Sequence, residues 1–281
     1  MTSTAISIRN LTVRHGPTVA VSNLNLEVRV GEVFGFLGPN GSGKSTTIRT
    51  LLGLIRPDAG EALVLGQDLA KAPAIARRRV GFLPGDLALF PHATGGETLS
   101  LFADLHGVAT PDRGTVLETL RFPDEALRRS VKGYSTGMRQ ALGIALAFQH
   151  RPELLVLDEP TTGLDPLARD AFLALVRMAR ARGATVFLSS HVLDEVDRVA
   201  DRIAIIAKGS LRMIETVAGI RATLPRRVTA IRKDGTEWVF ESAGPIDVLL
   251  DRLKSLELAD VEIGPVPLDV IFQQAVHKEG E

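Results

Sequence analysis

The alternation of apolar and polar residues predicts two antiparallel strands near the N-terminus, over residues 6–13 and 19–28. Residues 33–37 form instead a short continuous apolar run, which is typical of a parallel strand buried on both faces. A glycine-rich turn follows this run. After the turn, apolar residues recur at helical spacing: Ile48, Leu51, Leu52 and Ile55. The first part of the chain therefore predicts a small antiparallel subdomain beside a strand–turn–helix unit.

Further short runs rich in apolar residues predict the remaining strands, which give an α/β core with a parallel sheet. They span residues 61–65, 80–83, 154–157, 185–188 and 202–207. The pattern between residues 96 and 148 is helical throughout, with interruptions at Pro111 and Pro123. Later in the chain, Phe172, Leu175, Val176 and Ala179 form one stripe along a helix, which we interpret as core packing. These elements predict an α/β fold with a helical insertion at about 92–150.

The pattern changes at about residue 215, where we place a domain boundary. We expect a helix to residue 224, two strands around the turn at Asp234–Gly235, a helix over 246–256, and then a strand and a helix. The sequence therefore predicts a larger domain over 1–214 and a small C-terminal α+β domain over 215–281. The total of 281 residues agrees with two domains.

Composition narrows the function classes without identifying one. The 33 basic and 33 acidic residues give no net charge, so the basic surface of a dedicated nucleic-acid-binding protein is not expected. The chain has no cysteine, which excludes disulfides, cysteine-ligated zinc and thiol catalysis. Although mean hydropathy is high at +0.14, the longest clean apolar run covers only residues 141–148, and we predict neither a signal peptide nor a membrane span.

The turn after residues 33–37 carries the strongest chemical signal. It fits the pattern G-x-x-x-x-G-K-[ST], and it lies between a strand and a helix, as a phosphate-binding loop requires. Its glycines allow backbone N–H groups to converge on phosphate oxygens, Lys44 would reach the β- and γ-phosphates, and the Ser45 hydroxyl would ligate Mg²⁺. The predicted nucleotide-binding residues are Gly38, Pro39, Asn40, Gly41, Ser42, Gly43, Lys44, Ser45 and Thr46.

A second acidic site follows the apolar run at 154–157. A carboxylate at the tip of a buried strand, here Asp158, can hold Mg²⁺, and the next one, Glu159, can deprotonate an attacking water. Acidic residues are common at strand ends, so the pair alone leaves a purely structural role open.

Three further motifs, which follow the phosphate loop in this order, favour the functional role of Asp158 and Glu159 over the structural one. They are residues 134–140, residues 158–166 and the Ser-Ser-His run at 189–191. Over about 6–214 the sequence closely resembles the ATP-binding subunits of ABC transporters. The resemblance implies a P-loop NTPase fold with an antiparallel β subdomain, and a site that binds ATP and Mg²⁺.

The resemblance also assigns roles to individual residues. Asp158 corresponds to the Walker B carboxylate, Glu159 to the catalytic base, His191 to the switch histidine at the γ-phosphate, and Asp165 to the D-loop that meets a second subunit. Ser135, Thr136, Gly137 and Met138 stand where the signature motif caps ATP held by the partner. Ser135 is also a good helix N-cap, so a capping role without a ligand stays open.

Four positions depart from the family pattern. Thr136 and Met138 replace the usual signature residues. Gly85 stands where a Q-loop glutamine is expected, and we hypothesise that Asp86 supplies a carboxylate to the metal or that the loop only transmits motion. His15 occupies the position of the adenine-stacking aromatic, where an imidazole can stack less well than a phenol, and a solvated turn residue is the alternative.

A single set of motifs implies that two chains must meet to form two ATP sites. A homodimer is the favoured assembly, and pairing with a different ATPase chain is the alternative. Without spans of its own, such a subunit would work at the cytoplasmic face of the membrane through a separate permease, which Leu87, Leu89 and Phe90 could contact. Simple loop packing is the alternative for these three residues. Residues 267–272 resemble the ending of bacterial drug-exporter ATPases, so export is the favoured direction. The subunit of an importer, a non-transport ATPase of the family and a regulatory module without turnover remain alternatives.

Overall fold

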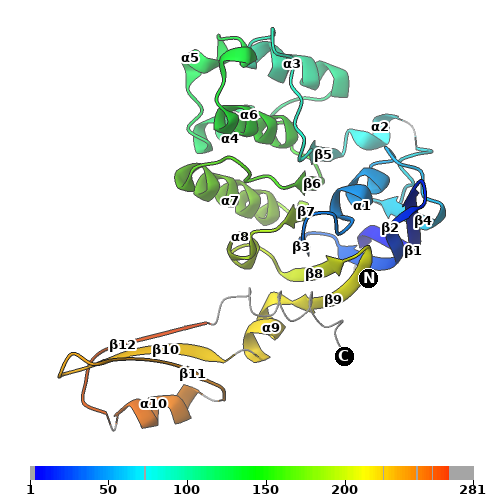
Figure 1. Cartoon of the computed structure of the whole chain (residues 1–281). Helices are drawn as coiled ribbons and strands as arrows, with labels where there is room; N and C mark the ends of the chain where they lie inside the picture. Colours follow the sequence, from blue (N-terminus) through cyan, green and yellow to red (C-terminus); the bar gives the residue numbers. More distant parts are fainter. Residues whose placement is uncertain (1–3, 73, 224, 245, 255, 266–281) are drawn as a thin grey trace. The chain divides into compact units, whose positions relative to one another are not determined.

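The computed structural model describes residues 4–72, 74–223, 225–244, 246–254 and 256–265 (Figure 1). Contacts divide the chain into two units, Met1–Ile214 and Glu215–Glu281. In the first unit, three antiparallel strands form a sheet in the order β2-β1-β4: β1 (Thr4–His15), β2 (Thr18–Arg29) and β4 (Ala59–Val64). The alternating pattern of residues 6–13 and 19–28 therefore predicted the right element type and pairing.

A six-stranded sheet forms the centre of the first unit, in the order β5-β6-β7-β3-β8-β9. The strands are β3 (Val33–Leu37), β5 (Val80–Leu83), β6 (Leu154–Asp158), β7 (Thr185–Ser190), β8 (Arg202–Ala207) and β9 (Ser210–Thr216). Neighbours from β5 to β8 pair in parallel, so the carboxyl ends of β3, β6 and β7 lie at one edge of the sheet. The sequence pattern did not reveal β9, whose side chains are all partly or fully exposed.

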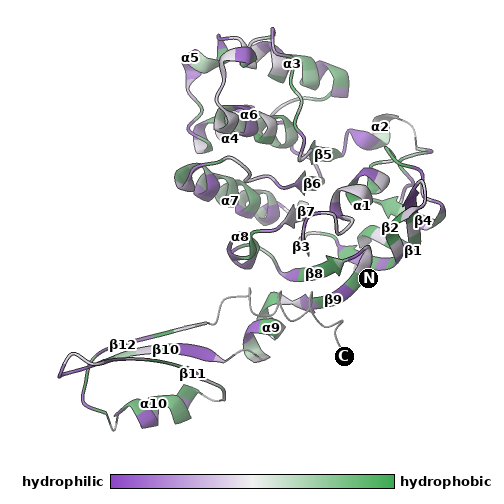
Figure 2. Ribbon diagram, in the orientation of Figure 1, coloured by the Kyte–Doolittle hydropathy of each residue, from purple (hydrophilic) through white to green (hydrophobic). Residues whose placement is uncertain are grey.

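The helical insertion holds α3 (Gly95–His106), α4 (Arg113–Thr119), α5 (Asp124–Leu127), a 3₁₀ turn (Val131–Gly133) and α6 (Thr136–Phe148). The other helices of the first unit are α1 (Lys44–Leu51), α2 (Ala74–Arg77), α7 (Pro166–Ala181) and α8 (Leu193–Asp197). The predicted stripe of α7 is buried, which confirms its core role, while α7 also carries strongly polar residues (Figure 2).

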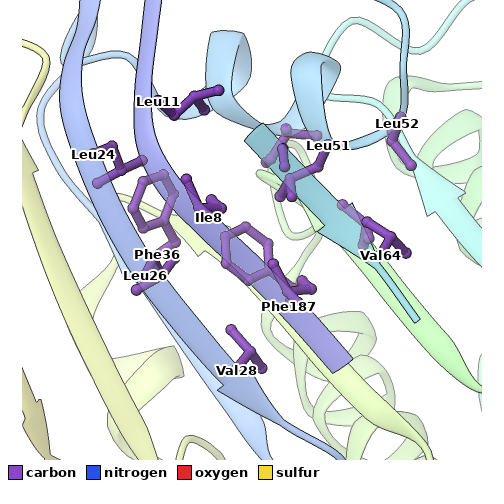
Figure 3. Close-up of a cluster of buried hydrophobic side chains, with 14 of the residues drawn as sticks. Ile8, Leu11, Leu24, Leu26, Val28, Phe36, Leu51, Leu52, Val64 and Phe187 are labelled. Carbon is purple, nitrogen blue, oxygen red and sulfur yellow. The ribbon is translucent and has the colours of Figure 1, made fainter. Parts of the chain in front are cut away.

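The core around β3 and β7 is built from aromatic and branched side chains. Phe36 of β3 and Phe187 of β7 are fully buried with ring centroids 5.3 Å apart, and Figure 3 shows them against Ile8, Leu24 and other side chains of the antiparallel sheet. Burial of an aromatic side chain of this size stabilises the fold by about 2–3 kcal/mol. This packing fixes the strand that leads into the phosphate loop.

The second unit contains α9 (Val217–Thr223), β10 (Arg226–Arg232), β11 (Glu237–Ser242), α10 (Ile246–Lys254) and β12 (Leu258–Pro265). Its antiparallel sheet has the order β11-β10-β12, and its core consists of Val228, Ala230, Leu249 and Leu253. The predicted last helix and the segment 267–272 lie outside the described residues. Within the described part of the chain, no helix combines the length and the apolar character that a membrane crossing needs.

Candidate functional site

The phosphate loop connects β3 to α1, and two of its glycines are required by geometry. A β-carbon at Gly38 would collide with the carbonyl oxygen of Ile206. Gly43 has a φ of 107°, in the region that favours glycine, and a β-carbon there would lie 2.6 Å from the carbonyl oxygen of Ala20. The loop is therefore pressed against β8 and β2, and it leads directly into the N-terminus of α1.

Lys44, the first residue of α1, is 6% exposed and folds back over the loop. Its Nζ donates to the carbonyl oxygens of Gly38 (2.7 Å) and Pro39 (3.3 Å) and lies 3.4 Å from Glu159 Oε1. The Ser42 hydroxyl is buried and has no hydrogen-bond partner. The buried Lys44 ammonium and the Ser42 hydroxyl, which has no hydrogen-bond partner, give the loop the donors that an anionic ligand needs.

Asp158 is the last residue of β6 and Glu159 follows it, at the same edge of the sheet. Asp158 is 5% exposed, and the Ser189 hydroxyl donates to its Oδ1 at 2.5 Å. Glu159 has a φ of 49°, which is unusual for a residue with a side chain, and its backbone N–H donates to Ser189 Oγ at 3.2 Å. Ser189 of β7 therefore hydrogen-bonds to both acidic residues. The sequence placed Ser189 in a motif but did not predict this role.

His191 follows β7 and completes the cluster. Its Nδ1 lies 2.6 Å from Glu159 Oε2, while Glu159 Oε1 faces Lys44 and has no hydrogen-bond partner. The His191 side chain is half-exposed and the Glu159 side chain is 19% exposed, so the pair lies between the buried carboxyl end of the sheet and solvent. Glu159 therefore contacts both Lys44, at the start of α1, and His191, which follows β7.

The segment that resembles the signature motif begins α6. Ser135 is the N-cap, since its Oγ accepts from the backbone N–H of Met138 at 3.2 Å. Ser135 and Thr136 are exposed, and a β-carbon at Gly137 would lie 3.2 Å from the carbonyl oxygen of Gly163. Asp165 is likewise a cap, at the start of α7, where its Oδ1 accepts from the N–H of Ala168 at 2.9 Å.

Two of the departures from the family pattern, His15 and the Q-loop segment at 85–86, lie in different surroundings. His15 Nε2 is 3.4 Å from Thr46 Oγ1, which places the imidazole beside the start of α1. The Asp86 carboxylate pairs with Arg49 at 2.9 Å, and its side chain is 76% exposed. Residue 85 is the one that faces the acidic site, because a β-carbon on Gly85 would lie 3.4 Å from Asp158 Oδ2. The structure thus turns Asp86 toward α1 rather than toward Asp158.

An apolar groove of about 300 Å³ lies between the helical insertion and the core. Leu87 and Leu89 line it, and Phe90 beside them is 54% exposed. His106 and His150 also line it, with ring centroids 4.9 Å apart. Burial and the neighbouring His106 lower the pKa of His150 to about 4, so its imidazole is neutral near pH 7.

Comparisons with known proteins agree with this geometry. The ABC transporter family model matches residues 21–162. The chain is 39% identical to the bacitracin transport ATP-binding protein BcrA of Bacillus licheniformis, over 74% of this chain and 69% of that one. It is 40% identical to the daunorubicin/doxorubicin resistance ATP-binding protein DrrA of Streptomyces peucetius, over 81% and 70%.

Solved structures show the same fold. A structure described as the ATP binding subunit of an ABC transporter is 31% identical, with a TM-score of 0.69 over 77% of this chain and 92% of that one. A bacterial ABC transporter cassette described as dimeric, MJ0796, has a TM-score of 0.70 over 75% and 98%, at 23% identity. The P-loop NTPase fold with an antiparallel β subdomain is therefore confirmed.

Proposed function

The chain belongs to the ATP-binding subunits of ABC transporters, which hydrolyse ATP to power transport, and from that premise we propose that it drives export through a separate permease. The observation that carries the direction is the identity of about 40% with proteins named for bacitracin transport and for daunorubicin/doxorubicin resistance. The chain would then work at the cytoplasmic face of the membrane, held there by the permease. Nucleic acid has no part in this function.

The nucleotide would bind along the Gly38–Thr46 loop. Loop N–H groups and Lys44 would hold its phosphates, and His15 would lie near the base, since it already contacts Thr46. Lys44 lies 3.4 Å from Glu159, so phosphate binding would draw the ammonium away and release the carboxylate. The unpartnered Ser42 Oγ and Glu159 Oε1 fit a site that is completed by its ligand.

Mg²⁺ fits the donors of this site. The Ser45 hydroxyl and the Asp158 carboxylate are oxygen ligands, which Mg²⁺ prefers, and Mg²⁺ commonly completes its shell with phosphate oxygens and water. When bound, the ion would neutralise charge on the phosphates. Asp86 is not among the proposed ligands, because its carboxylate is engaged with Arg49.

Glu159 would act as the general base. It would take a proton from a water whose oxygen attacks the γ-phosphorus, while the bond to the β-phosphate oxygen breaks and the electron pair leaves with ADP. His191, 2.6 Å from Glu159, would orient that carboxylate and contact the γ-phosphate. Such a base contributes about 10²–10⁴-fold to a rate.

A second copy of the chain would complete each site. The exposed N-terminus of α6, with Ser135, Thr136, Gly137 and Met138, presents backbone donors that could cap the γ-phosphate of ATP bound by the partner. Asp165, at the cap of α7, would meet the partner at the same interface. The groove lined by Leu87 and Leu89, with Phe90 at its side, would receive the permease.

The variant Glu159→Gln tests this mechanism. It keeps the size of the side chain and removes the base, so we expect ATP to bind and to hold two chains together without turnover. Light scattering with MgATP should then give the mass of a dimer for the variant and of a monomer for the variant with ADP. Normal hydrolysis by Glu159→Gln would contradict the mechanism.

The direction of transport has its own test. We expect a reading frame for a six-span permease beside the gene for this chain. A neighbouring gene for a substrate-binding protein would instead indicate an importer, and it would contradict the export proposal without affecting the ATPase mechanism.

A further inference from the structure

Glu195 is a buried carboxylate that the mechanism above does not use. It lies in α8, which begins two residues after His191, and it is 7% exposed. A buried carboxylate is costly unless other groups satisfy it, so its partners show what it is for. Its Oε2 accepts a hydrogen bond from Thr161 Oγ1 at 2.5 Å, and Thr161 is itself buried.

Thr161 belongs to the loop between Glu159 and Asp165, so this hydrogen bond joins the base loop to the helix that follows the switch histidine. The other oxygen, Glu195 Oε1, lies 3.7 Å from Arg169 Nε of α7. That guanidinium nitrogen also donates to the carbonyl oxygen of Leu164 at 3.1 Å. One carboxylate therefore lies at the meeting point of the base loop, α7 and α8.

The same loop is held from its other side by the helix of the signature segment. Gln140 of α6 is buried, and its Nε2 donates to the carbonyl oxygen of Pro160 at 2.7 Å. Because Gln140 and Glu195 hydrogen-bond to adjacent residues of the loop, Pro160 and Thr161, they restrain the backbone at Glu159. The left-handed conformation of Glu159 requires such support, since it is strained for a residue with a side chain.

We propose that Glu195 is a positioning residue for ATP hydrolysis, whose buried carboxylate fixes the Glu159 loop against the helix that follows His191. Its effect on the reaction passes through the 2.6 Å contact between Glu159 and His191. The proposal rests on the roles proposed above for those two residues. It predicts that loss of the Glu195–Thr161 hydrogen bond slows turnover while ATP still binds at the Lys44 loop.

Steady-state ATP hydrolysis by the full chain tests this assignment. We expect Glu195→Ala and Thr161→Val each to lower kcat about tenfold and to change KM for ATP less than about twofold. Glu195→Gln and Thr161→Ser can keep the hydrogen bond, so both should retain most of kcat. The double variant Glu195→Ala/Thr161→Val should be no slower than either single variant, since the two residues act through one contact.

Glu32→Ala is the matched control. Glu32 is 8% exposed and is paired with Arg202 at 3.1 Å, but it lies at the opposite edge of the sheet. We expect this control to lower stability and to keep kcat within about twofold of the parent. If Glu195→Ala does not fold, the comparison of Thr161→Val with Thr161→Ser still decides the matter.

Two results would overturn the assignment: losses of kcat that multiply in the double variant, or a loss for Thr161→Val no larger than for Thr161→Ser. Glu159→Gln, measured in the same assay, separates this from a failure of the proposed function. If Glu159→Gln retains turnover, the roles given to the site are wrong, whatever the Glu195 variants do.

Discussion

The two edges of the six-stranded sheet carry the same kinds of charged side chains and use them differently. At the carboxyl edge, Glu159 contacts both Lys44 and His191. At the amino edge, Glu32 pairs with Arg202, and Asp112 lies between Arg151 and Arg182. Burial and opposite charge are common to both edges, so neither property by itself marks a functional site.

The edges differ in how closely their charged partners approach one another. Glu32 Oε1 accepts from the backbone N–H of Arg29 at 2.7 Å and from Arg202. Asp112 Oδ1 receives two donors from Arg151, and its Oδ2 lies 2.9 Å from Arg182. At the carboxyl edge, Glu159 Oε1 and Ser42 Oγ are buried without a hydrogen-bond partner. Asp112 Oδ2 also has no hydrogen bond, but its guanidinium partner is 2.9 Å away, whereas Lys44 lies 3.4 Å from Glu159. Looser ion pairing beside the unpartnered Ser42 hydroxyl, rather than charge, distinguishes the carboxyl edge as a site that a ligand would complete.

The largest effect is expected from Lys44→Ala at the carboxyl edge. Removing the buried ammonium takes away the charge that phosphates need, so ATP affinity should fall by about 100-fold or more. Calorimetric titration with ATP measures this effect. Lys71→Ala is the control, because that lysine is 85% exposed and pairs only with Asp68 among the interactions described for it. Equal ATP affinities for the two variants would contradict the assignment of the phosphate loop.

Asp112→Asn, at the amino edge, should instead affect stability and leave ATP turnover nearly unchanged. It removes a buried charge from between two guanidinium groups, so the free energy of unfolding should fall by about 2–3 kcal/mol while turnover stays within about twofold. Chemical denaturation and an ATPase assay check the two parts. Asp251→Asn, in an exposed pair with Lys254, should change stability by less than about 0.5 kcal/mol. A loss of turnover without a loss of stability in Asp112→Asn would break the comparison.

His150, which precedes β6 at the amino edge, should set part of the acid limit of stability. Its folded pKa is about 4, below the ordinary value of 6.5, chiefly because burial disfavours the charged form. As pH falls from 6.5 to 4, the unfolded chain takes up a proton that the folded chain does not, so folding loses about 1–2 kcal/mol in this window.

Unfolding of His150→Gln as a function of pH tests this account. The variant should lose less stability than the parent chain between pH 6.5 and 4. His106→Gln should have a smaller effect, because the charge of His106 contributes only part of the shift at His150. An identical pH profile for His150→Gln and the parent would rule the account out.

The smallest effect is expected at Asp86. Its carboxylate pairs with Arg49 on the surface, so Asp86→Ala should change the Mg²⁺ dependence of turnover less than about twofold. Titration of activity with MgCl₂ measures it. A large increase in the Mg²⁺ requirement would restore Asp86 as a metal ligand and would extend the ligand-binding edge to this loop.

Sequence reasoning reached those parts of the molecule whose signals are local. The runs at 33–37 and 202–207, apolar except for Arg202, coincide with β3 and β8, because a strand buried on both faces is apolar almost throughout. The phosphate loop was found because its glycines and lysine are adjacent in the chain. In contrast, β9 mixes polar and apolar residues at a sheet edge and leaves no such pattern.

Contacts between segments that are far apart in the sequence could not be predicted from it. Thr161 and Glu195 lie 34 residues apart, and Ser189 reaches Asp158 from a different strand. Both contacts depend on which strands become neighbours in the sheet. The hypothesis for Asp86 shows the converse, because the sequence placed it next to the Q-loop position while the fold turned it toward Arg49.

The most direct test of the difference between the two edges is a paired measurement on Glu159→Gln and Glu32→Gln. For each variant, ATP turnover and the free energy of unfolding are measured on the same preparation. We expect Glu159→Gln to lose about 10²-fold or more in turnover with little loss of stability. Glu32→Gln should lose about 1–3 kcal/mol of stability and keep its turnover. Proportional losses of turnover and stability in both variants would contradict the claim that one edge binds and hydrolyses ATP while the other holds the fold.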